Sequence, residues 1–247
     1  MRRTSSRLAE GELTHIDRVA VDIELARRQW EDYTAALEAN GFPVVEIDAS
    51  DDHADSVFIE DAVVIFGDLA VLTSPGAESR RGETDAVRPV LDRLGLEVAT
   101  IELPGTLDGG DVLKVGTRVY VGLGSRTNAQ GIEQLRAIVA PRGYNVVAVP
   151  VTRALHLKSA VTALPDGTVI GHPDLVDHPE VFDRYLAVPE HEGVAVVVLD
   201  DTSVLMSSAA PESTRIFEGL GYRVVTVGIS EFEKLEGCVT CLSVRVR

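Results

Sequence analysis

The feature that most constrains the fold of this chain is an order of elements that returns four times: two short apolar runs joined by a tight turn, an amphipathic helix, and a third apolar run. The turns Gly116-Thr117 and Asp166-Gly167 support the hairpins, because tight hairpin turns favour residues that tolerate a positive φ angle. We therefore expect an α/β fold of repeated units. As hairpin, helix and strand, the predicted units are 57–73, 83–94 and 96–101; 112–122, 127–139 and 146–149; 160–171, 179–185 and 186–188; and 194–206, 211–220 and 224–227.

The two ends of the chain carry the rest of the pattern. A helix is predicted over 22–39 and a strand over 44–47, and the stretch 242–246 alternates like a strand. Joined in space, these segments would supply most of a fifth unit and close a ring, which hides the edges of the sheets. No linker or shift of composition divides residues 1–247, so we expect one domain. An ordinary open α/β sheet is the alternative that the pattern alone leaves.

The charge balance limits the partners of the protein. The 247 residues include 39 acidic and 23 basic side chains, which gives a formal net charge of −16. A nucleic-acid partner is not expected, because the chain has no surplus of basic side chains to neutralise phosphates. A cationic small ligand is favoured instead.

The apolar runs of the sequence are all strand-sized, so no membrane segment is expected. The first residues are followed by a polar and acidic stretch, which does not resemble a secretory signal. We therefore expect a cytoplasmic protein whose two cysteines are reduced thiols.

A cysteine and a histidine far apart in the sequence are candidates for nucleophilic catalysis. Cys241 lies at the start of the last predicted strand, and His156 lies far upstream of it. A thiolate nucleophile needs a group that carries protons, and histidine does this near neutral pH. The alternative is that Cys241 packs as a small buried hydrophobe, which is common for free cysteines.

Cys238 and Cys241 also form a C-x-x-C motif, which is typical of redox pairs and of one half of a zinc site. A structural zinc site needs four ligands, and the histidines of this chain do not offer a pair at the usual spacing. A thioredoxin-like pair would lie between a strand and a helix near the start of the chain. We therefore expect Cys238 to be structural, and a redox or zinc role is the last alternative.

Two acidic segments could bind a guanidinium group or orient a histidine. Glu60 and Asp61 follow the predicted strand residues 56–59, and carboxylates at such a position can hold a planar guanidinium by bidentate hydrogen bonds. Asp108 lies in the stretch 106–111, where two carboxylates surround a glycine pair and an acid could orient a histidine. Each segment could also be a plain solvated turn.

Two basic side chains could bind a carboxylate. Arg80 and Arg126 lie on predicted loops and look exposed, so they could clamp the acidic end of a ligand or be ordinary surface charge.

Six blocks of the sequence together carry a much more specific signal than any single motif. They are DSVFIED (55–61), SPGAESRR (74–81), TLDGGDVL (106–113), VGLGSRTN (121–128), LHLKS (155–159) and LEGCVTCLSV (235–244). In their order and separation they resemble the dimethylarginine dimethylaminohydrolase family of the guanidine-modifying amidinotransferase superfamily. The resemblance runs from Leu13 to Val246.

The resemblance implies a fold and an active site. The fold would be a five-bladed α/β propeller, a pentein, with pseudo-fivefold symmetry and the active site in its central channel. Cys241 would be the nucleophile, His156 the general acid and base, and Asp108 the carboxylate that orients His156.

The same resemblance implies how the substrate is bound. Glu60 and Asp61 would face its guanidinium group. Leu13 would lie on a loop that closes over it. Its amino-acid end would be held by Asp55, Arg80 and Arg126.

The resemblance implies hydrolysis of small Nω-methylated arginines to citrulline and dimethylamine or methylamine, through a covalent thiouronium on Cys241 and without a metal or organic cofactor. Related arginine deiminases have an acid two residues after the histidine, where this chain has Lys158, which favours a methylated substrate. The alternatives are an arginine deiminase, a hydrolase of another guanidine, and a non-catalytic propeller that only binds a ligand.

The start of the chain departs from the family pattern. The strand that usually precedes the N-terminal leader is nearly absent before Leu13. We therefore expect one incomplete blade, whose exposed sheet edge would favour a homo-oligomer.

Overall fold

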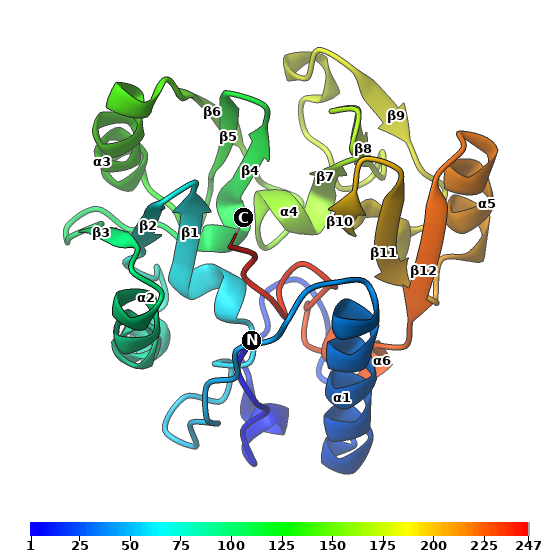
Figure 1. Cartoon of the computed structure of the whole chain (residues 1–247), viewed down its shortest axis with the longest axis horizontal. Coiled ribbons are helices and arrows are strands. Elements are labelled where there is room, and N and C mark those ends of the chain that lie inside the picture. Colours follow the sequence, from blue (N-terminus) through cyan, green and yellow to red (C-terminus); the bar gives the residue numbers. More distant parts are fainter. Residues whose placement is uncertain (247) are drawn as a thin grey trace.

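The computed structural model describes residues 1–246, in which twelve strands form four three-stranded sheets of one design. In each sheet two antiparallel strands form a hairpin, and the third strand pairs in parallel with the second. Three hairpin turns contain Gly67, Gly116 and Gly167 with φ angles of 64°, 59° and 82°, as the turn chemistry predicts. The sheets surround a common centre (Figure 1). The strands are β1 (Val63–Phe66), β2 (Leu69–Leu72), β3 (Glu97–Thr100), β4 (Val112–Val115), β5 (Arg118–Leu123), β6 (Asn145–Pro150), β7 (Val161–Ala163), β8 (Val169–Gly171), β9 (Tyr185–Ala187), β10 (Val196–Asp200), β11 (Ser203–Ser207) and β12 (Arg223–Val227).

A helix joins the hairpin to the third strand in three of the four units: α2 (Arg88–Arg93), α3 (Ala129–Val139) and α5 (Pro211–Gly219). Asn128 caps α3 by accepting a hydrogen bond from the Gly131 N–H, and Leu135 lies on its buried face. Two predicted helices are partly wrong. In the first, residues 83–86 belong to a 3₁₀ segment, Glu78–Ala86, and only 88–93 form the α-helix α2, whereas the helical part of 179–185 is the 3₁₀ turn Pro179–Val181. Short segments with few apolar contacts do not offset the cost of helix nucleation.

The helix α1 (Ile23–Ala39) occupies the remaining sector of the ring (Figure 1). Asp22 caps it by accepting a hydrogen bond from the Leu25 N–H at 2.9 Å. The predicted strands over 44–47 and 242–246 are wrong. Within residues 1–246, the β-pairing of these segments consists of one parallel bridge, between Arg2 and Ile47. An alternating sequence becomes a strand only where a neighbouring strand pairs with it.

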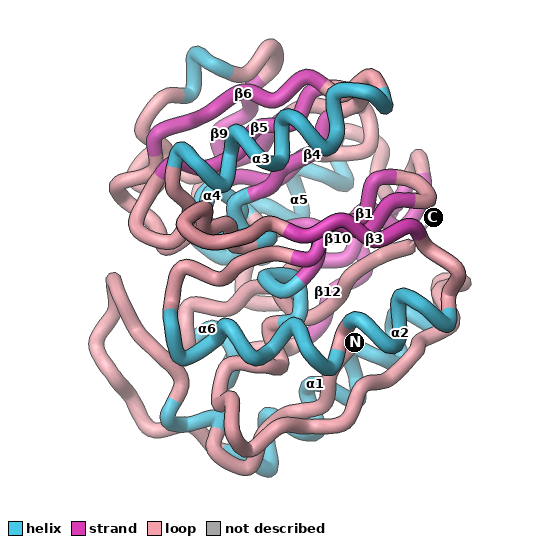
Figure 2. The backbone as a smooth tube through the Cα atoms, turned by 90° about the vertical axis from the view of Figure 1, so that its left-hand side faces the viewer, coloured by secondary structure: helices cyan, strands magenta, loops and turns pink. Residues whose placement is uncertain are grey.

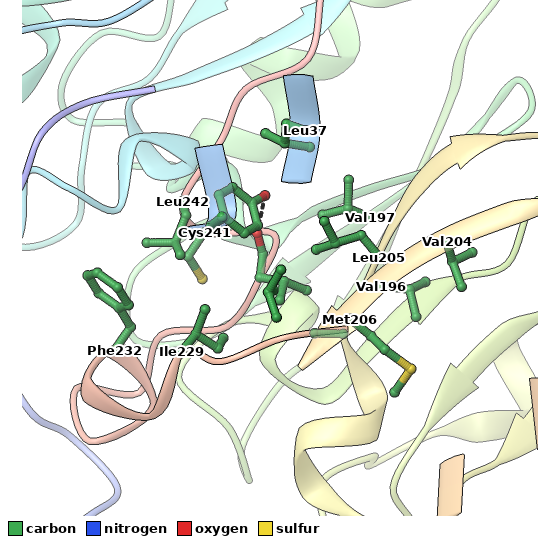
Figure 3. Close-up of a cluster of buried hydrophobic side chains, with 14 of the residues drawn as sticks. Leu37, Val196, Val197, Val204, Leu205, Met206, Ile229, Phe232, Cys241 and Leu242 are labelled. Carbon is green, nitrogen blue, oxygen red and sulfur yellow. Dashed lines mark hydrogen bonds between the residues drawn. The ribbon is translucent and has the colours of Figure 1, made fainter. Parts of the chain in front are cut away.

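The largest core cluster packs α1 against the fourth sheet and the C-terminal loop. Leu37 of α1, Leu205 of β11 and Phe232 converge on the loop that carries Cys241 (Figure 3). The fully buried Tyr33 of α1 places its hydroxyl 2.8 Å from both the Val239 carbonyl oxygen and the Ser243 hydroxyl. The helix therefore holds both sides of the turn around Cys241.

Two further helices of one turn lie beside the central loops: α4 (Leu157–Ala160) and α6 (Ser230–Glu233). Long loops connect these elements across the molecule, with α1 along one side (Figure 2). Among the described helices, none combines the length and the apolar character that a membrane span requires.

Candidate active site

A small cavity collects side chains from segments that are far apart in the sequence. Six of the nine predicted site residues line it: Asp55, Asp61, Arg80, Arg126, His156 and Cys241. Glu12, Phe58, Leu155, Leu235, Glu236 and Gly237 complete its wall. The cavity measures about 20 Å³, which is room for about one water molecule. The other three predicted residues, Leu13, Glu60 and Asp108, are not part of its wall.

The His156 ring lies between two carboxylates. Its Nε2 atom is 3.0 Å from Asp108 Oδ2, and its Nδ1 atom is 3.7 Å from Asp61 Oδ1. Asp108 is fully buried, and its other oxygen accepts a hydrogen bond from the Gly76 N–H at 2.8 Å. Burial lowers the pKa of His156, but Asp61, Asp108 and Asp111 outweigh burial and raise this pKa to about 9. At neutral pH His156 is therefore protonated and can donate a proton.

Asp61 presents a fixed negative charge to the cavity. Its Oδ2 atom accepts a hydrogen bond from Arg80 Nη1 at 2.7 Å, and its Oδ1 atom accepts one from the Gly110 N–H at 2.8 Å. Burial raises the pKa of Asp61, but the charges of His156 and Arg80 outweigh burial and lower this pKa to about 2. The ionised carboxylate suits a cationic group in the cavity.

The segment around Glu60 and Asp61 is not part of a strand, although it lies within the hairpin predicted over 57–73. It forms a 3₁₀ turn, Ile59–Ala62, which comes before β1 and not after a strand. The Glu60 N–H donates to the carbonyl oxygen of Cys241 at 3.2 Å. Both acids are buried, which rules out a solvated turn. The segment forms a turn and not a strand because two adjacent buried carboxylates need polar partners that a sheet ladder does not supply.

The glycine pair of the 106–111 stretch allows these groups to meet. A Cβ atom at Gly109 would lie 1.9 Å from the Glu60 carbonyl oxygen. A Cβ atom at Gly110 would lie 2.6 Å from both Asp61 Oδ1 and His156 Nδ1. Only glycine fits at these two positions, because its backbone can approach its neighbours closely.

Cys241 ends a tight turn that begins at Cys238. The Cys241 N–H donates to the Cys238 carbonyl oxygen at 3.1 Å, and the two sulfur atoms are 3.4 Å apart. The hydrogen bond with Cys238, burial, and the charges of Glu60 and Asp61 raise the pKa of Cys241 well above its usual value. A cation bound in the cavity would oppose this effect and favour the thiolate.

Glu60 lies on the far side of the cavity wall. Its Oε1 atom is 2.6 Å from Lys158 Nζ, and its Oε2 atom accepts a hydrogen bond from the Thr240 hydroxyl at 2.8 Å. Glu60 and Lys158 line a second and larger cavity of about 380 Å³. Its walls include residues of the hairpins of all four sheets.

The two predicted carboxylate clamps are buried, so the expectation that they are exposed is wrong. Arg80 pairs with Asp61 and, at 2.9 Å, with Glu83, which leaves it little capacity for a ligand. Arg126 has a hydrogen-bond donor left for a ligand. Its Nη2 atom is 3.1 Å from Glu12, and its buried Nη1 atom has no hydrogen-bond partner among residues 1–246.

A loop at residues 11–15 covers the cavity near Arg126. Glu12 contributes its carboxylate to Arg126, and its backbone N–H donates to Asp55 at 3.0 Å. Leu13 is half-buried and packs against the large core cluster. The next two N–H groups, of Thr14 and His15, donate to the carboxylate of Glu236. The loop is therefore tied down at both ends.

The comparisons with known proteins agree with this arrangement. The chain is 57% identical to an N(G),N(G)-dimethylarginine dimethylaminohydrolase of Streptomyces coelicolor, over 100% of this chain and 96% of the relative. The chain belongs to the dimethylarginine dimethylaminohydrolase family. A second member of this name, from Pseudomonas aeruginosa, is 34% identical over 98% of this chain and 97% of its own length.

Solved structures place the chain in the same family. A cysteine-to-serine mutant of the Pseudomonas aeruginosa enzyme, complexed with citrulline, matches with a TM-score of 0.91 and 33% identity over 99% of this chain and 96% of that structure. The N-terminal domain of an arginine dihydrolase matches with a TM-score of 0.82 at 20% identity, covering 92% and 88%, and shares the fold. The family model described as arginine deiminase matches residues 92–203.

Sequence reasoning missed three residues of this family member's site. Asp111 accepts hydrogen bonds from Thr127 Oγ1 at 2.6 Å and from the Leu157 N–H at 2.9 Å, and so fixes the residue after His156. The glycine-flanked pair of acids pointed to it. No motif of the sequence indicated Glu12 or Glu236. In the structure Glu236 adopts a φ angle of 59°, which is uncommon for a residue with a side chain.

Two groups of side chains in the described chain have metal-ligand spacing: Asp61, Asp108 and His156 in the site, and His172, Asp174 and His191 near the surface. The atoms of the first group already bind one another, Arg80 and backbone N–H groups. Its arrangement is that of a hydrogen-bonded acid–base network. Neither group includes Cys238 or Cys241.

Proposed function

We propose that this protein hydrolyses Nω-methylated arginines to citrulline and dimethylamine or methylamine, through a covalent intermediate on Cys241. One observation carries the proposal: Cys241, the ionised Asp61 and His156, whose ring is hydrogen-bonded to the buried Asp108, meet at one cavity in a full-length member of this family. Solved family structures include a complex with citrulline and an adduct with S-methyl-L-thiocitrulline, which fit a citrulline product and a covalent step.

Substrate binding would use charge at both ends of the cavity. Asp61 would accept hydrogen bonds from the guanidinium. The Glu60 carboxylate already binds Lys158 and Thr240. A carboxylate offers about four acceptor sites, so Glu60 could accept a hydrogen bond from the guanidinium while it keeps these two partners.

The amino-acid end of the substrate would bind at the opposite wall of the cavity. The unpaired Nη1 atom of Arg126 supports its role as the carboxylate clamp, and Asp55 would receive the ammonium group. Arg80 contributes charge behind Asp61, and Leu13 closes the loop over the ligand.

The first chemical step would form a carbon–sulfur bond. The bound guanidinium supplies the positive charge that favours the Cys241 thiolate in an acid-rich site. The thiolate attacks the central guanidinium carbon, the bond to the methylated nitrogen breaks, and His156 protonates the departing amine. The product of this step is a thiouronium on Cys241.

The second step would release citrulline. His156, now neutral, takes a proton from a water molecule, which attacks the thiouronium carbon. The carbon–sulfur bond breaks, Cys241 recovers its electron pair, and the remaining proton of the attacking water passes to solvent as the ureido group of citrulline forms. Asp108 keeps the ring oriented and stabilises its charged form through both steps. The Cys241 thiolate supplies the nucleophile and the His156 imidazole carries the proton, so these two steps need no cofactor.

We propose further that residues 1–247 form one domain with the architecture of a five-bladed α/β propeller. The four sheets of one design, with α1 in the remaining sector, support this proposal. The fifth blade would consist of α1, the Arg2–Ile47 bridge and loops. A cytoplasmic location and self-association through the poorly paired fifth unit belong to the same proposal.

Citrulline formation tests the activity. The purified protein is incubated with asymmetric dimethylarginine and, separately, with arginine, with Cys241→Ser as the control. Citrulline from the methylated substrate alone, lost in the mutant, is the expected result. Citrulline from arginine with release of ammonia would identify a deiminase instead. No product, together with no covalent adduct from a haloamidine, would identify a ligand-binding propeller.

A further inference from the structure

The proposed nucleophile has a second thiol beside it. Cys238 and Cys241 are the two cysteines of the chain, and the mechanism proposed above uses only Cys241. Their sulfur atoms lie 3.4 Å apart, and the Cys238 N–H is also 3.4 Å from Cys241 Sγ. Two thiols this close are poised to react with one another once either of them is oxidised.

We propose that Cys238 is a resolving thiol, which converts an oxidised Cys241 into a reversible Cys238–Cys241 disulfide when the protein meets hydrogen peroxide or another hydroperoxide. The site is one of covalent modification, and its reactant is the peroxide. The loss of activity that follows rests on the proposed function, whereas the disulfide itself does not.

The chemistry proceeds in two balanced steps. The Cys241 sulfur attacks one peroxide oxygen as the thiol proton leaves, the O–O bond breaks, and the products are a sulfenic acid on Cys241 and water, or an alcohol from an organic hydroperoxide. The Cys238 thiol then attacks the Cys241 sulfur, the S–O bond breaks, and water leaves with the thiol proton. The peroxide is reduced, and two thiols are oxidised to one disulfide.

The backbone between the cysteines suits this bond. The hydrogen bond from the Cys241 N–H to the Cys238 carbonyl oxygen closes a four-residue turn, which keeps the two Cα atoms less than about 7 Å apart. Disulfides form at Cα separations of about 4.4–6.8 Å. The sulfur atoms must therefore approach by little more than about 1 Å to reach bonding distance.

The two cysteines differ in their surroundings, since Cys241 is buried and Cys238 is half-buried. Cys241 lines the active-site cavity, so a small peroxide that enters the cavity meets this residue. Cys238 does not line that cavity, and its sulfur contacts the Thr240 hydroxyl at 3.3 Å and the Lys158 carbonyl oxygen at 4.0 Å. Because Cys241 is the cysteine that lines the cavity, we assign the first oxidation to Cys241 and the resolving step to Cys238.

Mass spectrometry of the wild-type protein tests the disulfide directly. Trypsin cleavage after Lys234 and Arg245 places both cysteines in one peptide, 235–245. The protein is treated with hydrogen peroxide, its free thiols are alkylated under denaturing conditions, and the mass of the tryptic peptide is measured. We expect the peptide to lose two hydrogen masses and take up no alkyl group. After dithiothreitol, it should take up two.

Activity and a matched pair of variants complete the test. Cys238→Ser and Cys238→Ala each remove the resolving thiol, and either one serves if the other folds poorly. We expect peroxide to lower wild-type citrulline formation more than about 10-fold and dithiothreitol to restore it to within about 2-fold. In the variants we expect a loss that dithiothreitol does not restore, with sulfinic acid on Cys241.

Two results would overturn the proposal: Cys241 oxidised to sulfinic acid while Cys238 of the wild-type protein still takes up the alkylating agent, or a disulfide that joins two chains. If the methylated arginine is not turned over even before oxidation, the proposed function fails. The peptide mass then still decides whether Cys238 resolves Cys241.

Discussion

The carboxylate of Glu12 lies 3.1 Å from the Nη2 atom of Arg126, and so pairs with the side chain proposed to hold the carboxylate of the substrate. The pair leaves a cavity of about 20 Å³, far below the several hundred cubic ångströms of a typical ligand pocket. The loop at residues 11–15 must therefore move, and Glu12 must release Arg126, before an amino acid can bind.

Replacing Glu12 should strengthen substrate binding. In Glu12→Gln the negative charge that competes for Arg126 is lost, so KM for dimethylarginine should fall about 2- to 5-fold, as expected for a partly exposed ion pair. Steady-state kinetics measure this, with kcat close to the wild-type value. Glu10→Gln, which removes an exposed acid near the same loop, is the control. A rise in KM would instead assign Glu12 to binding the substrate ammonium group.

Removing the carboxylate of Asp108 should slow the reaction and shift its pH dependence. Asp108→Asn removes a negative charge that helps to raise the pKa of His156 to about 9. The pKa should fall, so the alkaline limb of the pH–kcat profile should move to lower pH, and kcat should drop about 100-fold or more. An alkaline limb that stays in place would show that His156 is not the titrating acid.

Alkaline pH should destabilise the fold through the same histidine. The pKa of His156 is about 9 in the folded protein and about 6.5 in an unfolded chain, so the folded state binds the proton more tightly. The stabilisation is full below pH 6.5 and is lost as the pH rises towards 9, by about 3 kcal/mol in total. Urea unfolding at several pH values measures it. His156→Gln should flatten this dependence, and an equally steep dependence in that variant would contradict the assignment.

A methyl group at Gly110 should disrupt the site and spare the fold. In Gly110→Ala the new Cβ would meet Asp61 Oδ1 and His156 Nδ1 at 2.6 Å, so both side chains must move. We expect kcat/KM to fall about 100-fold, because displacement of catalytic groups by about 1 Å has this effect. Gly219→Ala, at the end of α5 with nothing within 4 Å, is the matched control and should keep full activity. Normal activity in Gly110→Ala would mean that the His156 ring is free to relocate.

Removing the hydroxyl of Tyr33 should loosen the turn that carries Cys241. Tyr33→Phe deletes two buried hydrogen bonds, to Val239 and Ser243, and leaves the Val239 carbonyl oxygen without this partner. The free energy of unfolding should fall by about 1–3 kcal/mol, which chemical denaturation measures. Tyr222→Phe, at a half-buried tyrosine away from the site, should change stability much less.

The sequence by itself determined the repeated unit. β4 has the predicted bounds of its hairpin strand, and Gly95 ends the first helical segment with a φ angle of 71°, as expected for a glycine stop. Hairpin turns, helix caps and apolar periodicity are set by neighbouring residues. These features can therefore be predicted without knowledge of the partner elements.

The sequence also determined where the chemistry had to lie, because six blocks match one family in order. What those blocks could not give is the environment of each side chain. Cys241, His156 and Asp61 share a cavity, whereas Glu60 turns away from it to Lys158, 98 positions along the chain. Such contacts depend on how loops from separate units meet.

Only the tertiary structure decided the rest. The alternating stretches 44–47 and 242–246 do not form strands, because a strand needs a neighbouring strand, and within residues 1–246 their one β-bridge joins Ile47 to Arg2. Arg80 and Arg126 are buried because acids from distant segments neutralise them. Long-range packing brings Glu12 into its ion pair with Arg126 and places Asp111 behind His156. Local sequence patterns carry no information about contacts of that kind.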